Sequence, residues 1–259
     1  MSNVLLVEQR LPAVILTLNR PDKQNAFDHA TFDALERELA LIDLDPEIRG
    51  VILTGNEKVF STGGDLAQAL EIETILDTKL WLDRFARVNA KLEVLTKPVI
   101  AAIHGYCLTG GLELALCCDI RIAATTAKFG VTSSRIGTVA GAGATQRLAR
   151  LIGAEWTKEL LFSGEFVDAE TALRIGIVSQ VTDPDKVVAA ALARIEVYAK
   201  RAPLSVWYAK LAVNNGLQMD LQSGLNYERQ LTTGLFQTND RKEGMAAFLQ
   251  KRPADFKGR

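Results

Sequence analysis

The hydrophobic positions of the N-terminal two-thirds of the chain alternate between two kinds of pattern. Short runs rich in β-branched residues, bounded by Pro, Gly, Asn or Asp, predict strands at residues 4–7, 14–18, 51–54 and 99–103. Hydrophobic residues spaced for one helix face predict helices at residues 31–42 and 74–95 and just after Thr109. Strands that alternate with helices indicate a mainly parallel sheet with helical crossovers, and therefore an α/β fold.

The pattern changes from residue 185 onward. Four helices are predicted there, with no strand between them, at residues 186–200, 204–216, 219–235 and 241–250. We therefore divide the chain into an α/β core, residues 1–184, and an all-helical C-terminal region, residues 185–259.

Composition and charge narrow the class of protein. A chain of 259 residues, of which 48% are hydrophobic, can bury a full core. A net charge of −1 argues against a nucleic-acid binder that neutralises many phosphates. Glu8 interrupts the first apolar stretch, and no run reaches the ~18 apolar residues of a membrane span, so we expect neither a secretory signal nor a membrane partner.

The three cysteines, Cys107, Cys117 and Cys118, match neither a disulfide framework nor a zinc-ligand spacing. We therefore expect a reducing, cytoplasmic location and no metal site.

One segment combines a strand, a Gly-Gly turn and a carboxylate. The predicted strand at 99–103 leads to Gly110 and Gly111, which open a helix. Glycines let backbone N–H groups approach a ligand, and a helix N-terminus adds unpaired donors that can stabilise an oxyanion. Glu113 lies three residues beyond Gly110 among hydrophobic neighbours, which favours a raised pKa and proton transfer near neutral pH. The same residues also fit a structural role, close packing by the glycines and a dipole-complementing glutamate.

A second glycine-bearing turn follows the predicted strand at 51–54. It contains Gly63 and Gly64 and precedes a helical stretch. Asp65 fits a helix cap, which is the structural interpretation. The alternative is that the two turns supply one N–H donor each to a single carbonyl oxygen.

Six motifs in order make the chain resemble the enoyl-CoA hydratase/isomerase (crotonase) superfamily almost end to end. They are Leu18-Asn-Arg-Pro-Asp-Lys-Gln-Asn-Ala26, Phe60-Ser-Thr-Gly-Gly-Asp-Leu66, Gly105-Tyr-Cys-Leu-Thr-Gly-Gly-Leu-Glu-Leu-Ala115, Cys118-Asp-Ile-Arg-Ile-Ala123, Gly141-Ala-Gly-Ala-Thr-Gln-Arg-Leu148 and Gly164-Glu-Phe-Val-Asp-Ala-Glu-Thr-Ala172.

The resemblance implies a crotonase-like ββα spiral followed by a helical region that forms homotrimers, often paired into dimers of trimers. It implies an acyl-CoA thioester substrate, no cofactor beyond that coenzyme A, and an oxyanion hole made by the N–H groups of Gly64 and Gly110. It also implies a set of substrate- and CoA-binding residues, namely Lys23, Gln24, Ala26, Thr62, Asp65, Leu66, Tyr106, Lys251 and Phe256.

The chain departs from the hydratase pattern at one position. Family hydratases use two glutamates, of which the first matches Glu113 and the second lies in a Phe-Gly-x-Pro-Glu segment. The aligned stretch here is Phe129-Gly-Val-Thr-Ser133, so Ser133 stands where the second glutamate would be. A serine hydroxyl is a poor proton reservoir near neutral pH.

Three functions therefore stay open at this stage. The first is an enoyl-CoA hydratase that adds water to 2-enoyl-CoA with Glu113 as the surviving acid/base. The second is another enolate reaction, either isomerisation of an enoyl-CoA double bond or decarboxylation of a malonyl-type acyl-CoA. The third is a non-catalytic RNA- or protein-binding member of the family, which the near-neutral charge disfavours.

Overall fold

The structure is a computed structural model of the chain, and it describes residues 4–259. A six-stranded sheet forms its centre, in the order β1–β2–β3–β5–β7–β10. The strands are β1 (Leu5–Arg10), β2 (Ala13–Leu18), β3 (Gly50–Thr54), β5 (Val99–Ile103), β7 (Ile120–Ala124) and β10 (Gln180–Thr182). Strand β1 pairs antiparallel with β2, and every other pair is parallel, which confirms the predicted mainly parallel sheet.

A smaller four-stranded sheet has the order β4–β6–β8–β9. Its strands are β4 (Val59–Ser61), β6 (Tyr106–Leu108), β8 (Lys128–Gly130) and β9 (Val167–Asp168). Strands β3, β5 and β7 of the large sheet are each followed by a strand of the small sheet and then by helical structure. This repeated strand–strand–helix turn is the spiral that the resemblance implied.

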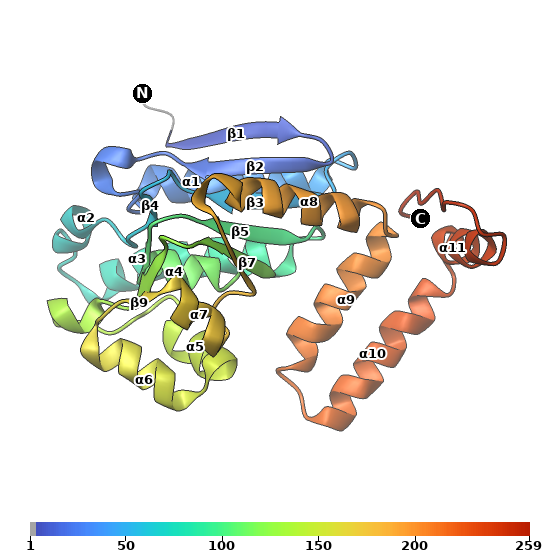
Figure 1. The fold of residues 1–259 in the computed structure, drawn as a ribbon. Coiled ribbons are helices and arrows are strands. Elements are labelled where there is room, and N and C mark those ends of the chain that lie inside the picture. The colour runs from blue at the N-terminus through green and yellow to red at the C-terminus, as the bar shows by residue number, and fades with distance from the viewer. Residues whose placement is uncertain (1–3) are drawn as a thin grey trace.

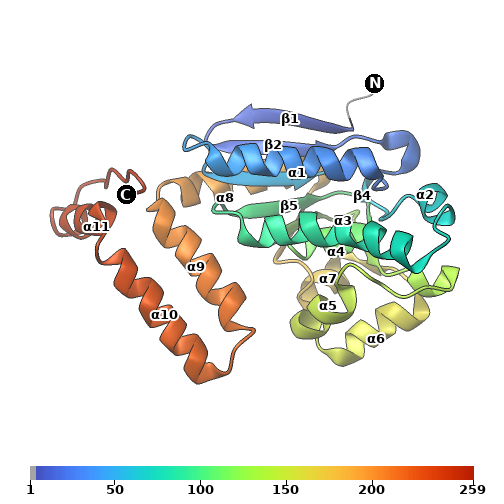
Figure 2. The ribbon, with the colours of Figure 1, turned by 180° about the vertical axis from the view of Figure 1, so that it is seen from behind.

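Helices cover both faces of the large sheet. Helix α8 lies in front of it in Figure 1, whereas α1 and α3 lie in front of it in the reverse view of Figure 2. The helices of the body are α1 (His29–Leu44), α2 (Leu66–Leu70), α3 (Ile75–Val94), α4 (Gly110–Ala115), α5 (Ala144–Ile152), α6 (Ala154–Ser163), α7 (Ala169–Ile175) and α8 (Val187–Ala199). Three short 3₁₀ helices are η1 (Pro21–Lys23), η2 (Ser133–Ile136) and η3 (Pro184–Lys186).

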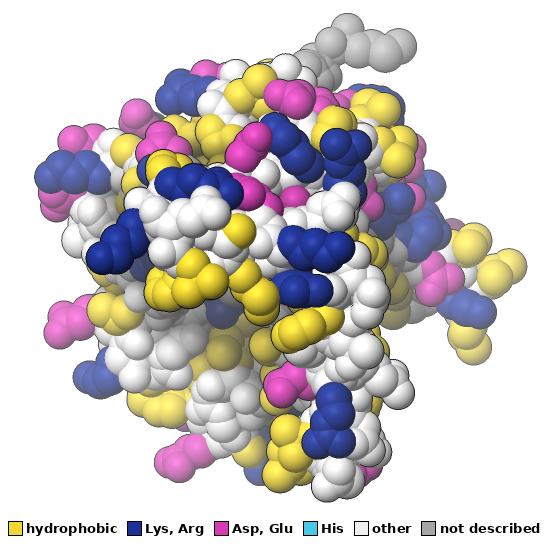
Figure 3. Space-filling model, turned by 90° about the vertical axis from the view of Figure 1, so that its right-hand side faces the viewer, with side chains coloured by type: hydrophobic (Ala, Val, Ile, Leu, Met, Phe, Trp, Pro, Cys, Tyr) yellow, Lys and Arg dark blue, Asp and Glu magenta, His cyan; other side chains and the backbone are white. Residues whose placement is uncertain are grey.

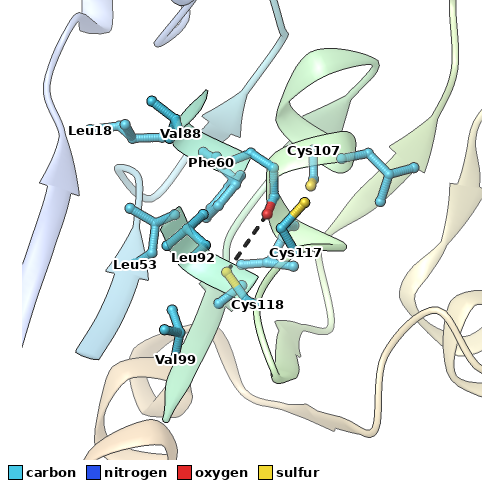
Figure 4. Packing of buried hydrophobic residues seen from close by; sticks show 14 of the residues in the cluster. Leu18, Leu53, Phe60, Val88, Leu92, Val99, Cys107, Cys117 and Cys118 are labelled. Carbon is cyan, nitrogen blue, oxygen red and sulfur yellow. Dashed lines mark hydrogen bonds between the residues drawn. The ribbon is translucent and has the colours of Figure 1, made fainter. Parts of the chain in front are cut away.

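The main hydrophobic core lies between the two sheets and helices α1, α3 and α4. Figure 4 shows Cys107, Cys117 and Cys118 inside this core beside Phe60 and Leu92. All three thiols are free and buried, and burial raises their pKa, to about 12 for Cys118. These cysteines therefore behave as small hydrophobic side chains.

The C-terminal helices extend from the body as an arm made of α9 (Pro203–Gly216), α10 (Leu221–Leu235) and α11 (Asn239–Leu249). Helix α8 packs on the large sheet instead, so the division of the chain at residue 184 stays a prediction. Lys210 of α9 joins the arm to the body, because its Nζ lies 3.0 Å from Oδ2 of Asp119 and both side chains are largely buried.

Hydrophobic side chains remain exposed on the arm, as the side view in Figure 3 shows among the charged residues. The most exposed are Leu217, Leu221, Phe248 and Leu249. A cavity of about 1010 Å³ lies between α9 and the body. No helix within residues 4–259 is both long and apolar enough to cross a membrane.

Candidate active site

The two predicted glycine turns meet in the structure. Strands β4 and β6 pair in parallel, so the turns that follow them lie at the same edge of the small sheet. A methyl group added to Gly63 would lie 2.8 Å from the amide nitrogen of Gly110, and one added to Gly110 would lie 3.3 Å from the amide nitrogen of Gly64. The two backbones are therefore in direct contact, and glycine is required for this approach.

The amide groups of Gly64 and Gly110 are available to a ligand. Gly110 is the first residue of α4, so its N–H has no acceptor within the helix. The bridge between Phe27 and Gly64 uses the Gly63 carbonyl and the Asp65 N–H, which leaves the Gly64 N–H unused. Across residues 4–259, neither amide donates a hydrogen bond.

Aromatic side chains of α3 pack behind both glycines. A methyl group on Gly64 would lie 3.0 Å from Trp81, and one on Gly110 would lie 2.8 Å from Phe85. The two rings pack edge to face with centroids 5.7 Å apart. Hydrogen bonds from the two amides would therefore form against an apolar wall, where electrostatic interactions are stronger than in water.

Glu113 is held one helical turn beyond Gly110 on α4. Its side chain is only 2% exposed, and Oε1 accepts hydrogen bonds from the amides of Ala142 (2.8 Å) and Ala144 (2.9 Å). Burial raises the pKa of this carboxyl above its usual range, against the opposing effect of those two hydrogen bonds. A carboxyl with a raised pKa can both accept and return a proton near neutral pH.

Ser133 is the first residue of η2 and is buried. Its carbonyl accepts hydrogen bonds from the amide (3.0 Å) and the hydroxyl (3.3 Å) of Thr138. The preceding residue, Thr132, is hydrogen-bonded to Thr109, the neighbour of Gly110. Ser133 therefore lies in a segment that is joined directly to the second glycine turn.

Most of the expected CoA-binding residues gather beside Gly64. The carbonyl of Gln24 accepts a hydrogen bond from the Thr62 amide (3.3 Å), which joins the loop after β2 to the loop after β4. Arg20 contacts the Ala26 carbonyl and lies 3.0 Å from the Asp65 carboxylate. Burial would raise the pKa of Asp65, but the Arg20 guanidinium and backbone amides lower it overall. Asp65 therefore caps α2 as a carboxylate, while Lys23 and Leu66 remain exposed nearby.

Three other expected residues are not gathered with this group. Tyr106 is 44% exposed at the start of β6, where its ring packs against Phe166. Lys251 and Phe256 follow α11, which lies at the opposite end of the molecule from α2 in Figures 1 and 2. Phe256 packs against Gly244 of α11. A single chain therefore does not bring Lys251 and Phe256 to the glycine turns.

Asn25 supports the site, although sequence reasoning assigned it no role of its own. It is 1% exposed and has a left-handed backbone with φ of 53°. Its Nδ2 donates to the carbonyls of Val59 (3.0 Å) and Phe60 (3.1 Å), and its carbonyl accepts from the Ser61 hydroxyl (2.8 Å), which in turn accepts from the Gly63 amide. Asn25 thereby fixes the loop that carries Gly64. The sequence offered one sign of this role, because asparagine tolerates a left-handed backbone and stands inside the first family motif.

Asn89 of α3 supports the other side of the site. Its side chain is 2% exposed, and Nδ2 donates to the Ala142 carbonyl (3.0 Å), which also accepts from Arg147. Arg147 is itself held by two hydrogen bonds to Glu93. This network orders the loop whose amides hold Glu113. Within residues 4–259, no group of three or more His, Cys, Asp or Glu side chains is arranged to hold a metal ion.

The chain is similar to known proteins over almost its whole length. Residues 12–259 match the family described as enoyl-CoA hydratase/isomerase. The chain is 40% identical to the 2,3-dehydroadipyl-CoA hydratase of Escherichia coli K12, over 98% of this chain and 99% of the relative. It is 38% identical to the short-chain-enoyl-CoA hydratase of Clostridium acetobutylicum, over 100% of this chain and 99% of the relative. Its structure superposes on a crystal structure of an enoyl-CoA hydratase from Bacillus anthracis with a TM-score of 0.95 and 37% identity, covering 99% of this chain and 100% of the other.

Proposed function

Because this chain belongs to the enoyl-CoA hydratase/isomerase family, we propose that it is an acyl-CoA-processing enzyme that adds water to a 2-enoyl-CoA. The observation that carries this proposal is the meeting of two unpaired amides, Gly64 and Gly110, beside one buried carboxyl, Glu113. The full-length similarity to named hydratases supports the same reaction.

The amides of Gly64 and Gly110 form the proposed oxyanion hole. The thioester oxygen accepts a hydrogen bond from each amide, so both donors stabilise the negative charge that develops when the substrate becomes an enolate. Donors of this kind contribute about 2.7–4 kcal/mol each in enzymes where one has been removed. The aromatic wall behind the glycines keeps water away from that charge.

Glu113 moves the proton in this proposal. As a carboxylate it accepts a proton from water while the water oxygen attacks the β-carbon, and the electron pair of the double bond passes to the enolate oxygen. The same carboxyl then returns that proton to the α-carbon, so the net change is the addition of one water. The raised pKa of Glu113, caused by its burial, suits both half-steps.

Ser133 favours a second candidate function, because it stands in the place of the hydratases' second carboxylate. Isomerisation of an enoyl-CoA double bond needs one group that removes a proton from one carbon and returns it to another. Decarboxylation of a malonyl-type acyl-CoA needs chiefly the oxyanion hole, because carbon dioxide leaves its electron pair in the enolate, which is then protonated. Glu113 would serve either reaction alone.

Product analysis by mass spectrometry separates these reactions. The purified chain is incubated with 2-enoyl-CoAs of several chain lengths, 3-enoyl-CoAs and malonyl-type acyl-CoAs. Hydration adds the mass of one water, isomerisation leaves the mass unchanged, and decarboxylation removes carbon dioxide. We expect hydration of 2-enoyl-CoA; inertness toward every 2-enoyl-CoA would refute the hydratase, and inertness toward all three classes would favour a binding-only protein.

We further propose that the chain works as a homotrimer or a dimer of trimers and that a partner copy completes the CoA site. Exposed hydrophobic side chains on the arm support association, and the distance of α11 from α2 means that Lys251 and Phe256 would act on a neighbour's substrate. Light scattering tests the assembly. In Lys251→Ala, KM should rise for CoA thioesters but not for pantetheine thioesters, which lack the nucleotide; an equal rise for both would contradict this assignment.

We also infer a reducing, cytoplasmic location, since the three cysteines are unpaired and buried.

A further inference from the structure

Thr109, the residue immediately before Gly110, has a backbone conformation that threonine rarely adopts. Its φ is 45° and its ψ is −113°. This region favours glycine, and a β-branched side chain makes it still less favourable. Such conformations persist only where the surrounding contacts hold them, and they cluster at functional sites.

Hydrogen bonds hold Thr109 on three sides. Its amide donates to the Gly130 carbonyl of β8 (2.9 Å), and its carbonyl accepts from the Glu113 amide of α4 (2.8 Å). Its side-chain Oγ1 accepts from the Thr132 amide (3.0 Å) and lies 2.9 Å from the Thr132 hydroxyl. The threonine side chain therefore supplies contacts that glycine at this position would lack.

Thr109 immediately precedes Gly110, so its backbone conformation affects the direction of the proposed oxyanion donor. Because the peptide group is planar, the ψ angle of Thr109 sets the direction in which the Gly110 N–H points. The Thr109 carbonyl also makes the first hydrogen bond of α4, to the amide of Glu113. A rotation at Thr109 would therefore move the amide donor and the start of the helix that carries the carboxyl.

The partner of Thr109 lies at the point where the chain departs from the hydratase pattern. Thr132 stands where the Phe-Gly-x-Pro-Glu segment has proline, and Ser133 stands where it has glutamate. Proline has no backbone N–H, so the bond from the Thr132 amide to Oγ1 of Thr109 cannot form in a chain with that segment.

We propose that Thr109 and Thr132 form a clasp, a pair of positioning residues that sets the direction of the Gly110 N–H and joins the oxyanion loop to the segment carrying Ser133. The clasp rests on the proposed oxyanion hole. Its observed contacts are the bond from the Thr132 amide to Oγ1 of Thr109 and the contact between the two hydroxyls. Removing it should weaken polarisation of the thioester carbonyl more than it weakens binding of the CoA moiety.

The test measures that polarisation directly. Dimethylaminocinnamoyl-CoA absorbs at longer wavelength when hydrogen bonds draw electron density onto its thioester oxygen, so its spectrum when bound reports the oxyanion hole without turnover. Thr109→Gly removes the hydroxyl and the unfavourable side chain, Thr109→Ser keeps the hydroxyl, and Thr132→Val removes one hydroxyl at nearly constant volume. Thr157→Val is the matched control, because it removes a buried hydroxyl bonded to a backbone carbonyl (2.8 Å) in α6.

We expect Thr109→Gly to reduce the spectral shift by at least half and to lower kcat by about 10–100-fold. KM should change by less than about two-fold, as it does when the lost interaction acts mainly in the transition state. Thr132→Val should change both readouts in the same direction, Thr109→Ser should restore both, and Thr157→Val should change neither. A full shift and full kcat in both Thr109→Gly and Thr132→Val would overturn the clasp. Absence of any shift in the unaltered chain would refute the oxyanion hole and the clasp with it.

Discussion

Replacing Glu113 by glutamine removes the proposed proton carrier with little change in shape. The glutamine oxygen can still accept the hydrogen bonds from Ala142 and Ala144, which reach a single oxygen of the carboxylate. The amide cannot take up or return a proton, so the loss should be that of general acid–base catalysis, about 10²–10⁴-fold in kcat. This corresponds to about 3–5 kcal/mol of activation free energy.

The assay is steady-state loss of the conjugated thioester absorbance, with the product identified by mass. Glu155→Gln is the matched control, since Glu155 also lies in the first turn of a helix but is exposed. We expect the control to keep its kcat and Glu113→Gln to keep a KM close to that of the unaltered chain. A Glu113→Gln protein that retains full kcat would refute the assignment of Glu113 as the proton carrier.

The pH dependence of the same pair of proteins gives an independent check. Burial raises the pKa of Glu113 in the folded chain above its ordinary value of 4.5. At a pH between the ordinary and the raised pKa, Glu113 is protonated more often in the folded chain than in the unfolded chain. Its contribution to the free energy of unfolding therefore falls as pH rises through this window. The resulting loss of stability is absent below the ordinary pKa and complete above the raised one.

Glu113→Gln has no such titration and should therefore gain stability relative to the unaltered chain as pH rises from about 4 to 8, as measured by urea unfolding. The activity of the unaltered chain should rise over the same pH range, because Glu113 must be in its carboxylate form to accept a proton from water. The kcat/KM of the unaltered chain should fall as pH decreases through the raised pKa. A stability difference that is independent of pH would contradict the buried carboxyl with its raised pKa.

Three further substitutions test other parts of the account. Gly110→Ala places a methyl group 2.8 Å from Phe85 and should displace the amide donor. Steady-state kinetics should then show kcat lowered by about 10²–10³-fold, and an unchanged kcat would contradict the oxyanion assignment. Ser133→Glu supplies the absent carboxylate and should raise the hydration rate by about 10²-fold or more; a folded variant with no gain in the same assay would show that this position does not face the substrate. Lys210→Met leaves the largely buried Asp119 carboxylate without its ion-pair partner. Urea unfolding should show a free energy of unfolding lower by about 3–5 kcal/mol. A loss below about 1 kcal/mol would mean that water effectively screens the pair.

The sequence predicts four of the six strands of the large sheet, β1, β2, β3 and β5, and misses β7 and the three-residue β10. The strands expected at 51–54 and 99–103 are β3 and β5, in which every residue is buried. The strands of the small sheet have two or three residues each and are too short for a detectable period. The small sheet nevertheless brings the two glycine turns together, so residue spacing alone could not establish that they touch.

The surroundings of Glu113 were also beyond sequence reasoning. A helix places Glu113 beyond Gly110 by spacing alone, and that geometry agrees with the structure. The amides of Ala142 and Ala144, which hold the carboxylate, lie 29 and 31 residues away along the chain, and no local pattern links them to it. The positive φ of Thr109 was hidden as well, because threonine gives no sign of a conformation that usually requires glycine.

A crystal structure of the chain with bound butyryl-CoA tests the central proposal most directly, since this saturated thioester keeps the carbonyl but cannot be hydrated. We predict that the thioester oxygen lies about 2.7–3.1 Å from both amide nitrogens, Gly64 and Gly110, with the Glu113 carboxyl facing the α- and β-carbons. An acyl-CoA bound with its thioester oxygen out of reach of both amides would contradict the account.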